Sequence, residues 1–370
     1  MHLVLYRKYR PQNFSDIIGQ NHIVEILKKA ISLNRVGHSY LFAGPKGTGK
    51  TSLARILAKA VNCVNLQPPT SNLQPPFYEP CNKCDSCAEI TNGNSLDLVE
   101  IDAASNRGIN EIREIKETIR LHPFKSLYRI YIIDEVHMLT NEAFNAFLKI
   151  LEEPPKFVIF ILATTESDKI PETIISRCQE FKFRKVPEQL IRMSLKNILE
   201  KEKIKIEDGA LELLSIISDG SLRDAHSLLE QIIDFESKEI KEIDARNFFG
   251  APAPSLVNDF IFSIFDKKPE KSLEIISHIS DRGIDSRLFA KLILRNLRLI
   301  LLLTLAPNFE NELKNGINEK QMNFLKELKI KTNVAEAESA LKIFLDAYSS
   351  PSYSYLPELP LEIAVTKINQ

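Results

Sequence analysis

The sequence has no excess of charge of either sign, because 48 Lys and Arg residues nearly balance 49 Asp and Glu residues. The chain therefore has no overall positive charge of the kind that indicates nucleic-acid binding, and any DNA contact must come from a local patch. The N-terminus is too short and wrongly ordered for a signal peptide. The most apolar stretch, 288–305, is interrupted by Lys291, Arg295 and Arg298, which suits a buried helix better than a membrane span. We expect a cytoplasmic protein.

Cysteine is scarce: the five cysteines fit a reducing compartment, and four of them form a metal-like cluster. A chain of 370 residues exceeds one typical core, so two or three domains are expected. Its 44% apolar and 26% charged residues are typical of a globular protein.

Five short β-rich runs alternate with helical patterns up to about residue 183 and then stop. This order predicts an α/β core built on a parallel sheet. The runs are 40–43, 98–101, 129–133, 157–163 and 179–183. Later patterns are helical, with breaks at 207–209, 219–221 and 250–254. We predict three domains: an α/β core over 1–183 with an insertion at 63–87, a helical lid over 184–249, and an all-α domain over 250–370.

Residues 44–51 form a phosphate-binding loop of the form G-x-x-x-x-G-K-[ST], with the sequence Gly44-Pro45-Lys46-Gly47-Thr48-Gly49-Lys50-Thr51. A buried run precedes the loop and a helical pattern follows it, which is the context such a loop needs. The glycines let backbone N–H groups surround phosphates, Lys50 reaches their oxygens, and Thr51 joins the magnesium shell. A chance glycine-rich turn is the alternative. The motif predicts nucleoside triphosphate binding but not its purpose.

Two carboxylates, Asp134 and Glu135, end the apolar run at 129–133. In a parallel sheet this end lies beside the phosphate loop. Asp134 then suits a magnesium site, and Glu135 suits deprotonation of the attacking water. An acidic surface turn is the alternative for this pair alone. His137, nearby, is more often structural, and we assign it no role.

The cysteines at 63, 81, 84 and 87 have the spacing of a metal site. Four thiolates suit tetrahedral zinc and leave no open position, so the site would be structural. An iron–sulfur cluster is the competitor, but the fourth cysteine expected after three more residues is replaced by Thr91. Unligated thiols are the third possibility. Cys178 is expected to pack rather than to bind metal.

The ordered motifs resemble those of AAA+ ATPases, and Ser176-Arg177-Cys178 resembles the clamp-loader branch. Three further runs are similar to the bacterial DNA polymerase III gamma/tau family: Arg7-Lys8-Tyr9-Arg10-Pro11, Asp134-Glu135-Val136-His137-Met138-Leu139 and Leu151-Glu152-Glu153-Pro154-Pro155. The likeness is specific to about residue 250 and weaker beyond it.

The resemblance implies roles for single residues. Thr165 would be the sensor-1 residue, Arg223 the sensor-2 arginine of the lid, and Arg177 an arginine finger acting on ATP of a neighbouring subunit. The base would lie against Tyr9, Arg10, Pro11, Ile17 and Ile18. Arginine forks stabilise charge on phosphoryl oxygens, which agrees with both arginine roles. Taken singly, Arg177 would be a solvated cation.

The resemblance also implies the setting: an ATP-driven clamp loader that uses Mg²⁺ and contains Zn²⁺. Its expected partners are the delta and delta prime subunits and further copies of itself in a pentamer, together with the sliding clamp and primed DNA. The 250–370 domain would be the collar for assembly, although a self-contained helical domain fits the pattern equally. The chain is expected to be the short, gamma-like form, without the tau regions that bind polymerase and helicase.

Polymerase activity would belong to the holoenzyme, since no polymerase carboxylate triad is apparent in the chain. Basic residues such as Arg107 and Arg113 could face DNA or solvent. The rival functions are another AAA+ machine, such as a Holliday-junction motor or a remodeller, and a non-hydrolysing assembly subunit. The intact phosphate loop and carboxylate pair argue against the second rival.

Overall fold

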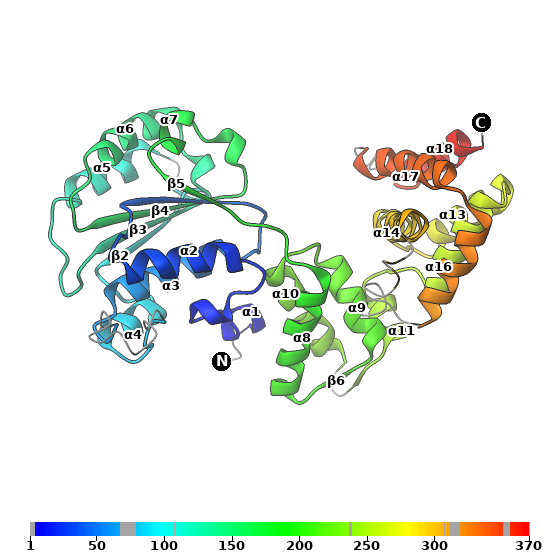
Figure 1. The fold of residues 1–370 in the computed structure, drawn as a ribbon, viewed down its shortest axis with the longest axis horizontal. Helices are drawn as coiled ribbons and strands as arrows, with labels where there is room; N and C mark the ends of the chain where they lie inside the picture. The colour runs from blue at the N-terminus through cyan, green and yellow to red at the C-terminus, as the bar shows by residue number, and fades with distance from the viewer. Residues whose placement is uncertain are drawn as a thin grey trace. The chain divides into compact units, whose positions relative to one another are not determined.

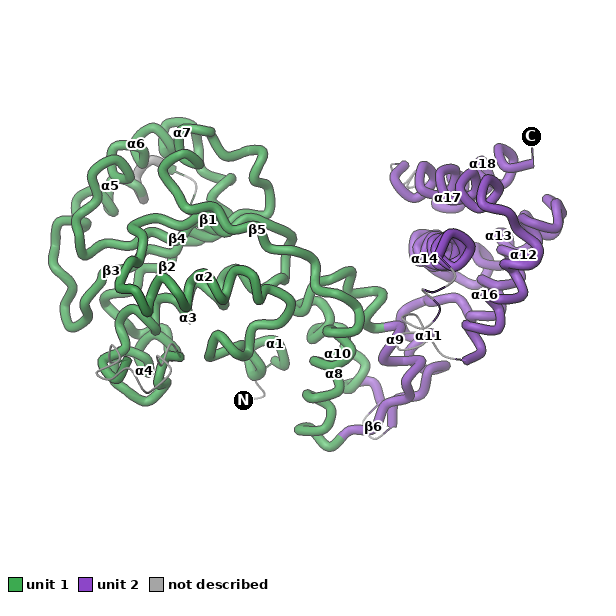
Figure 2. Tube along the Cα trace, viewed as in Figure 1, with its two compact units in different colours: residues 1–203, 214–234 green, residues 204–213, 235–370 purple. Residues whose placement is uncertain are grey.

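The structure of the chain is a computed structural model. It describes residues 4–66, 79–106, 108–236, 239–306, 308, 310, 319–350 and 356–369. Most of the proline-rich segment 67–80 and Arg107 lie outside these residues. The chain divides into two compact units, 1–203 with 214–234 and 204–213 with 235–370 (Figure 2). Each unit is described by itself.

A five-stranded parallel sheet forms the centre of the first unit, in the order β2-β3-β4-β1-β5. Each predicted strand is confirmed to within one residue at either end. The strands are β1 (Ser39–Ala43), β2 (Leu98–Asp102), β3 (Arg129–Asp134), β4 (Val158–Thr164) and β5 (Gln179–Lys182). β1 and β4 are buried along their whole length, as expected of strands covered on both faces.

Helices cover both faces of this sheet (Figure 1). α2 (Asn21–Ser32) and α3 (Lys50–Asn62) pack with one apolar cluster, which includes Leu27, Phe42 and Leu57. α5 (Ile109–Thr118) and α6 (Asn141–Glu152) belong to a second cluster with Phe147 and Phe160. The shorter elements of this part are α1 (Leu5–Lys8), η1 (Phe14–Asp16), α4 (Asp85–Asn92), η2 (Val136–Met138), η3 (Ser167–Lys169) and α7 (Glu172–Ile175).

The strand register brings three strand ends to one edge of the sheet. Ala43 pairs with Thr164, and Asp102 pairs with Asp134. The loops that follow β1, β3 and β4 therefore begin beside one another, although they are far apart in sequence. Such a carboxyl edge is where ligands bind in open α/β sheets.

Three helices follow the sheet: α8 (Glu188–Glu202), α9 (Asp208–Ile217) and α10 (Leu222–Phe235). The break at 219–221 is confirmed. The predicted break at 207–209 differs by a few residues from the observed one, which lies between the end of α8 at Glu202 and the start of α9 at Asp208. The expectation that strands stop after β5 was also wrong. Residues 205–206 (β6) and 239–240 (β7) form a small parallel pair within the second unit, too short to give a period-two pattern.

The rest of the second unit is helical. Its elements are α11 (Glu242–Phe248), α12 (Pro254–Phe265), α13 (Pro269–Asp281), α14 (Ser286–Leu305), α16 (Glu319–Lys331), α17 (Val334–Ser349) and α18 (Leu359–Ile368). The apolar stretch at 288–305 lies in α14, whose Leu297 and Ile300 are buried. Among the described residues, no helix is long and apolar enough to cross a membrane. The three-domain boundaries at 183 and 249 stay a prediction.

Candidate nucleotide-binding site and cysteine cluster

The phosphate loop joins β1 to α3, as the motif predicts. Three of its glycines, Gly44, Gly47 and Gly49, have φ of 148°, 73° and 101°, a region that other residues rarely adopt. At Gly44 a Cβ would also lie 2.4 Å from the carbonyl oxygen of Phe183. The loop thus turns tightly and ends at the first residue of α3, Lys50, where a helix N-terminus favours an anion.

Lys50 is 6% exposed and bends back over the loop. Its Nζ donates to the carbonyl oxygens of Gly44 (2.7 Å) and Pro45 (2.9 Å). Burial lowers the pKa of Lys50, while the carboxylates of Glu135 and Asp134 oppose that change. The ammonium therefore lies near both predicted acidic residues and can exchange carbonyl partners for phosphate oxygens.

Thr51 and Asp134 meet across 83 residues of sequence. The Thr51 hydroxyl donates to the Asp134 carboxylate over 2.9 Å. A hydroxyl and a carboxylate at the phosphate loop are the oxygen donors that Mg²⁺ takes in such sites. These two residues fit a magnesium ion, and they would hold it beside the phosphates.

Glu135 has a left-handed backbone, with φ of 49° and ψ of 45°. One carboxylate oxygen accepts from the backbone N–H (3.2 Å) and the hydroxyl (3.0 Å) of Thr165. The predicted base and the predicted sensor are thus hydrogen-bonded to each other. The structure brings Lys50, Asp134, Glu135 and Thr165 together at one edge of the sheet, as the sequence indicated.

His137 belongs to the same group, although no role is predicted for it from the sequence. Its side chain is 6% exposed; Nδ1 lies 3.0 Å from the Thr164 hydroxyl and 3.4 Å from the Glu135 carboxylate. Nε2 lies 3.3 Å from the Glu166 carboxylate. The ring thereby bridges the ends of β3 and β4. In the sequence, the only signal for this role is that His137 closely follows Asp134 and Glu135.

The start of α10 lies against the phosphate loop. The Leu222 N–H donates to the Gly47 carbonyl over 3.0 Å. A Cβ at Gly47 would lie 1.9 Å from the Ser221 Oγ and 3.3 Å from the Arg223 Cβ. The Arg223 guanidinium lies 5.2 Å from the Tyr6 ring centre, a cation–π distance. Arg223 is thus beside the loop of its own chain.

Arg177 lies at the other edge of the sheet. Its carbonyl accepts from the hydroxyl of Ser39, the first residue of β1, over 2.6 Å. Its guanidinium donates to the Glu152 carboxylate (2.8 Å) and the Thr173 carbonyl (2.9 Å). β1 has five residues and rises about 3.3 Å per residue, so it separates Arg177 from the phosphate loop by more than about 13 Å.

The residues predicted to contact the base pack against two different helices, α8 and α3. The Tyr9 hydroxyl donates to Glu202 on α8 over 2.6 Å, and burial with this hydrogen bond raises the pKa of Tyr9 to about 12. Arg10 Nε donates to the Ser52 hydroxyl on α3 over 3.4 Å. Pro11 and Ile18 are half-buried and Ile17 is buried. The contact of these residues with a base stays a prediction.

The four clustered cysteines converge, with all Sγ atoms within 4.8 Å of one another. Zinc ligands at 2.3 Å in a tetrahedron would place sulfurs about 3.8 Å apart, so the cluster fits zinc with little adjustment. Cys63 ends α3, and Cys87 lies on α4. Cys178 is absent from the cluster and packs against the second apolar core.

The turn from Cys81 to Cys84 surrounds the Cys81 sulfur with backbone donors. The N–H groups of Lys83 (3.4 Å) and Cys84 (3.3 Å) donate to the Cys81 Sγ. Burial would raise the pKa of Cys81, but these hydrogen bonds hold it at about 6. A thiol that ionises near neutral pH is a ready metal ligand. Cys63, Cys81, Cys84 and Cys87 would hold a structural zinc.

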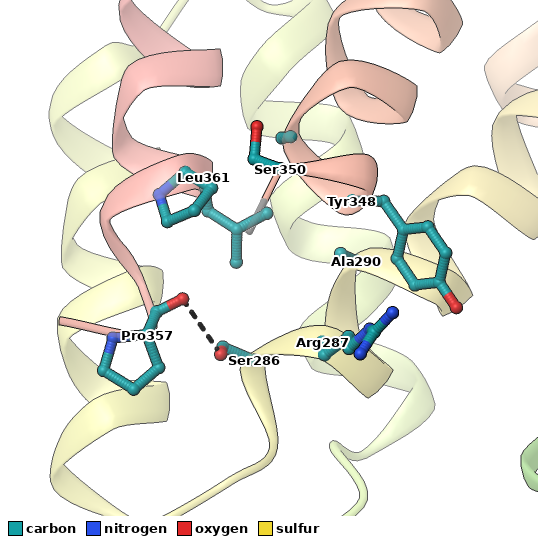
Figure 3. Close-up of a pocket in the computed structure, with 9 residues that line it drawn as sticks. Ser286, Arg287, Ala290, Tyr348, Ser350, Pro357 and Leu361 are labelled. Carbon is teal, nitrogen blue, oxygen red and sulfur yellow. Dashed lines mark hydrogen bonds between the residues drawn. The ribbon is translucent and has the colours of Figure 1, made fainter. Parts of the chain in front are cut away.

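A pocket in the second unit has no part in this site. It lies between α14, α17 and α18, where the Arg287 guanidinium is 5.3 Å from the Tyr348 ring centre and Ser286 Oγ donates to the Pro357 carbonyl (Figure 3). None of its lining residues is a predicted site residue.

Arg113, on α5 of the first unit, is exposed. Its contact with DNA stays a prediction.

Two family models match the chain. One is described as DNA polymerase III, delta subunit, and matches residues 19–187. The other is described as DNA polymerase III clamp loader subunit, ATPase lid domain, and matches residues 190–237. Together they cover the sheet and the helices after it.

Curated relatives extend over almost the whole chain. DNA polymerase III subunit tau of Bacillus subtilis is 41% identical over 99% of this chain and 63% of that protein. DNA polymerase III subunit gamma of Buchnera aphidicola from Acyrthosiphon pisum is 34% identical over 99% of this chain and 98% of that protein. The chain spans 40–63% of the length of the first curated relatives it matches.

A solved RuvB structure from Thermotoga maritima, a T158V variant, has a TM-score of 0.48 and 18% identity. The match covers 69% of this chain and 79% of that one. A likeness at this level carries no argument about function.

Proposed function

The chain belongs to the bacterial DNA polymerase III gamma/tau family, and from this premise we propose that it is an ATP-hydrolysing subunit of a clamp loader. The observation that carries the proposal is the meeting of Lys50, Thr51, Asp134, Glu135 and Thr165 at one edge of the sheet. A subunit that only assembled the complex would not need this hydrolytic set. DNA polymerisation is left to other subunits.

ATP and Mg²⁺ would bind at the phosphate loop. Lys50 would exchange the carbonyls of Gly44 and Pro45 for phosphate oxygens, and Thr51 with Asp134 would hold the metal. When bound, the ion would neutralise charge on the phosphates. The remaining work is positioning, which falls to the protein's own groups.

Glu135 would take the proton of the attacking water. In the structure its carboxylate is occupied by Thr165, so hydrolysis requires the two residues to exchange partners. Thr165 would then be free to contact the γ-phosphate. This paired arrangement supports a resting state in which the base is held back.

Arg223 would stabilise phosphate charge on its own subunit, and Arg177 on a neighbour. The position of Arg177, at the amino ends of β1 and β5, supports an action in trans. A site shared head to tail requires a heterologous interface, which gives rings or open spirals. We infer assembly with copies of this chain and with delta and delta prime subunits around primed DNA.

The test is ATPase activity after mixing with the partner subunits, with and without sliding clamp and primed DNA. We expect clamp and primed DNA together to stimulate turnover, and Lys50→Ala to remove the stimulated activity. Stimulation by a Holliday junction in place of clamp and primed DNA would overturn the clamp-loader assignment in favour of another DNA motor. Absence of ATPase activity in the unmodified assembly would refute hydrolysis.

A further inference from the structure

The cysteine turn and the predicted base segment are joined by one buried lysine, Lys59. It lies on α3 and is 2% exposed. Its Nζ donates to Asn82 Oδ1 (2.6 Å), between two cysteine ligands, and to the carbonyl (2.8 Å) and Oε1 (2.8 Å) of Gln12. Gln12 directly follows Tyr9-Arg10-Pro11, so one ammonium group holds both segments.

Further hydrogen bonds run between the same two segments. Asn82 Nδ2 donates to Asn13 Oδ1 over 2.7 Å. The Glu79 carboxylate accepts from the N–H groups of Phe14 (2.6 Å) and Ser15 (3.1 Å). Residues 79–82 therefore fix residues 12–15 through backbone and side chain. These contacts hold the backbone between Pro11 and Ile17, and they therefore help to position both residues.

The charge of the cysteine site is one reason why a lysine can be buried here. One Zn²⁺ with four thiolates carries a net charge of about −2. The three acceptors that receive hydrogen bonds from Lys59 are uncharged amide or carbonyl oxygens. A buried ammonium needs a compensating charge nearby. The tetrathiolate site would supply such charge through Cys87 and Cys81, together with the carboxylate of Asp16.

We propose that Lys59 is a positioning residue through which the zinc module holds residues 9–18 in the geometry that receives the nucleotide base. The inference rests on the proposed ATP binding and adds a role for the zinc module in it. Lys59 touches neither base nor phosphate; it acts through Gln12 and Asn82. Loss of the link should weaken binding of the base while leaving binding of the phosphates unchanged.

The test compares MgATP with magnesium tripolyphosphate, which lacks base and ribose, by titration calorimetry on the full chain. Lys59→Met should weaken MgATP binding about tenfold, the effect of losing one hydrogen bond to a charged group, and leave tripolyphosphate binding within about twofold. Lys83→Met is the matched control, because Lys83 is exposed on the same turn. We expect the control to bind both ligands as the unmodified chain does.

Asn82→Gly is the second variant, should Lys59→Met not fold. Asn82 has φ of 55°, which glycine adopts freely, so the change removes the side-chain links to Lys59 and Asn13 without straining the backbone. Zinc content is measured for each variant, and we expect one zinc per chain in Asn82→Gly with weaker MgATP binding. Unchanged MgATP affinity in Asn82→Gly, or an equal loss for tripolyphosphate, would overturn the inference.

Different results would refute the proposed nucleotide binding and the proposed role of Lys59. An unmodified chain that binds neither MgATP nor tripolyphosphate would refute nucleotide binding itself. A chain that binds both ligands through Lys50, with no effect of Asn82→Gly on either, would refute only the role of Lys59.

Discussion

Arg223 lies beside the phosphate loop of its own chain, whereas Arg177 lies at the amino ends of β1 and β5. The Arg223 Cβ is 3.3 Å from where a Cβ of Gly47 would be, and the preceding residue, Leu222, donates to the Gly47 carbonyl. Arg177 is held instead by Glu152 and Thr173, with Ser39 on its carbonyl. The two arginines thus flank opposite ends of one sheet.

The difference concerns what each arginine can sense. Arg223 lies on α10, so we expect its approach to the phosphates of its own subunit to report on closure of that subunit. Arg177 lies a strand's length from the phosphate loop of its own chain, so we expect it to act on phosphates of another subunit and to report on assembly. Its ion pair with Glu152 has side chains 35% and 51% exposed, and such pairs contribute only about 0–1 kcal/mol. Arg177 can therefore leave Glu152 at little cost when a neighbour docks.

The largest effect is expected from Lys50→Ala, which removes the buried cation of the phosphate loop. ATP turnover should fall by at least about 10³-fold and ATP affinity by about 10²-fold, because a buried charge on the phosphates is lost in ground state and transition state alike. The measurements are steady-state ATPase activity and calorimetry. Lys46→Ala, an exposed lysine of the same loop, should change neither by more than about twofold. Equal losses in the two variants would contradict the role of Lys50.

Arg177→Ala should lower turnover by about 10³-fold, the lower range for an arginine finger, and leave ATP affinity unchanged. Single-turnover kinetics of the assembled complex measure the first quantity, and binding to the isolated chain measures the second. Arg184→Ala, an exposed arginine after β5, is the control. Full hydrolysis by an Arg177→Ala assembly would contradict action in trans.

Mixing variants tests the comparison more directly. In assemblies of Arg177→Ala with Lys50→Ala, some interfaces combine an intact loop with an intact Arg177. A random 1:1 mixture should regain roughly a quarter of the unmodified activity, since each half is intact with probability one half. Two inactive variants that stay inactive when mixed would contradict a shared site.

Arg223→Ala should lower ATP affinity and turnover together, each by about tenfold, the value of one charge-assisted hydrogen bond to phosphate. The expected contrast with Arg177 appears on mixing. Arg223→Ala mixed with Lys50→Ala should regain nothing, because no subunit carries both Lys50 and Arg223. Recovery of activity in this mixture would place Arg223 on a neighbour's phosphates instead of its own.

The sequence predicted the sheet well for a physical reason. Strands of a parallel sheet are buried on both faces, so β1 and β4 read as continuous apolar runs that turn signals bound. The phosphate loop and the carboxylate pair follow such runs directly. Their meeting could be inferred because parallel strands align their carboxyl ends. The pair β6 and β7 gave no signal, since each strand has two residues.

Other features depend on long-range packing that no local pattern encodes. Lys59 looks like a solvated helix residue in sequence, and it is buried only because Gln12 and Asn82 approach it from 47 and 23 residues away. His137 contributes to the site through Thr164 and Glu166, which belong to the next strand end. The contact of the Arg10 guanidinium with Ser52 on α3 likewise joins residues 42 positions apart in the sequence.

The smallest effect concerns the helix that carries Arg223. His226, one turn later on α10, is 8% exposed and lies 3.3 Å from the Ser194 hydroxyl on α8. Burial lowers the pKa of His226 to about 4. Because the unfolded chain binds this proton near pH 6.5 and the folded chain does not, stability is full above about pH 6.5 and falls as the pH drops toward 4. His226→Gln removes that titration, so the difference in unfolding free energy between the unmodified chain and the variant should shrink by about 2 kcal/mol from pH 7 to pH 5. Denaturant unfolding at the two pH values measures this difference.

A difference that does not depend on pH would show that His226 binds its proton as readily in the folded chain as in the unfolded chain. In that case lowering the pH would not loosen α10, and Arg223 would keep its place beside the loop in acid.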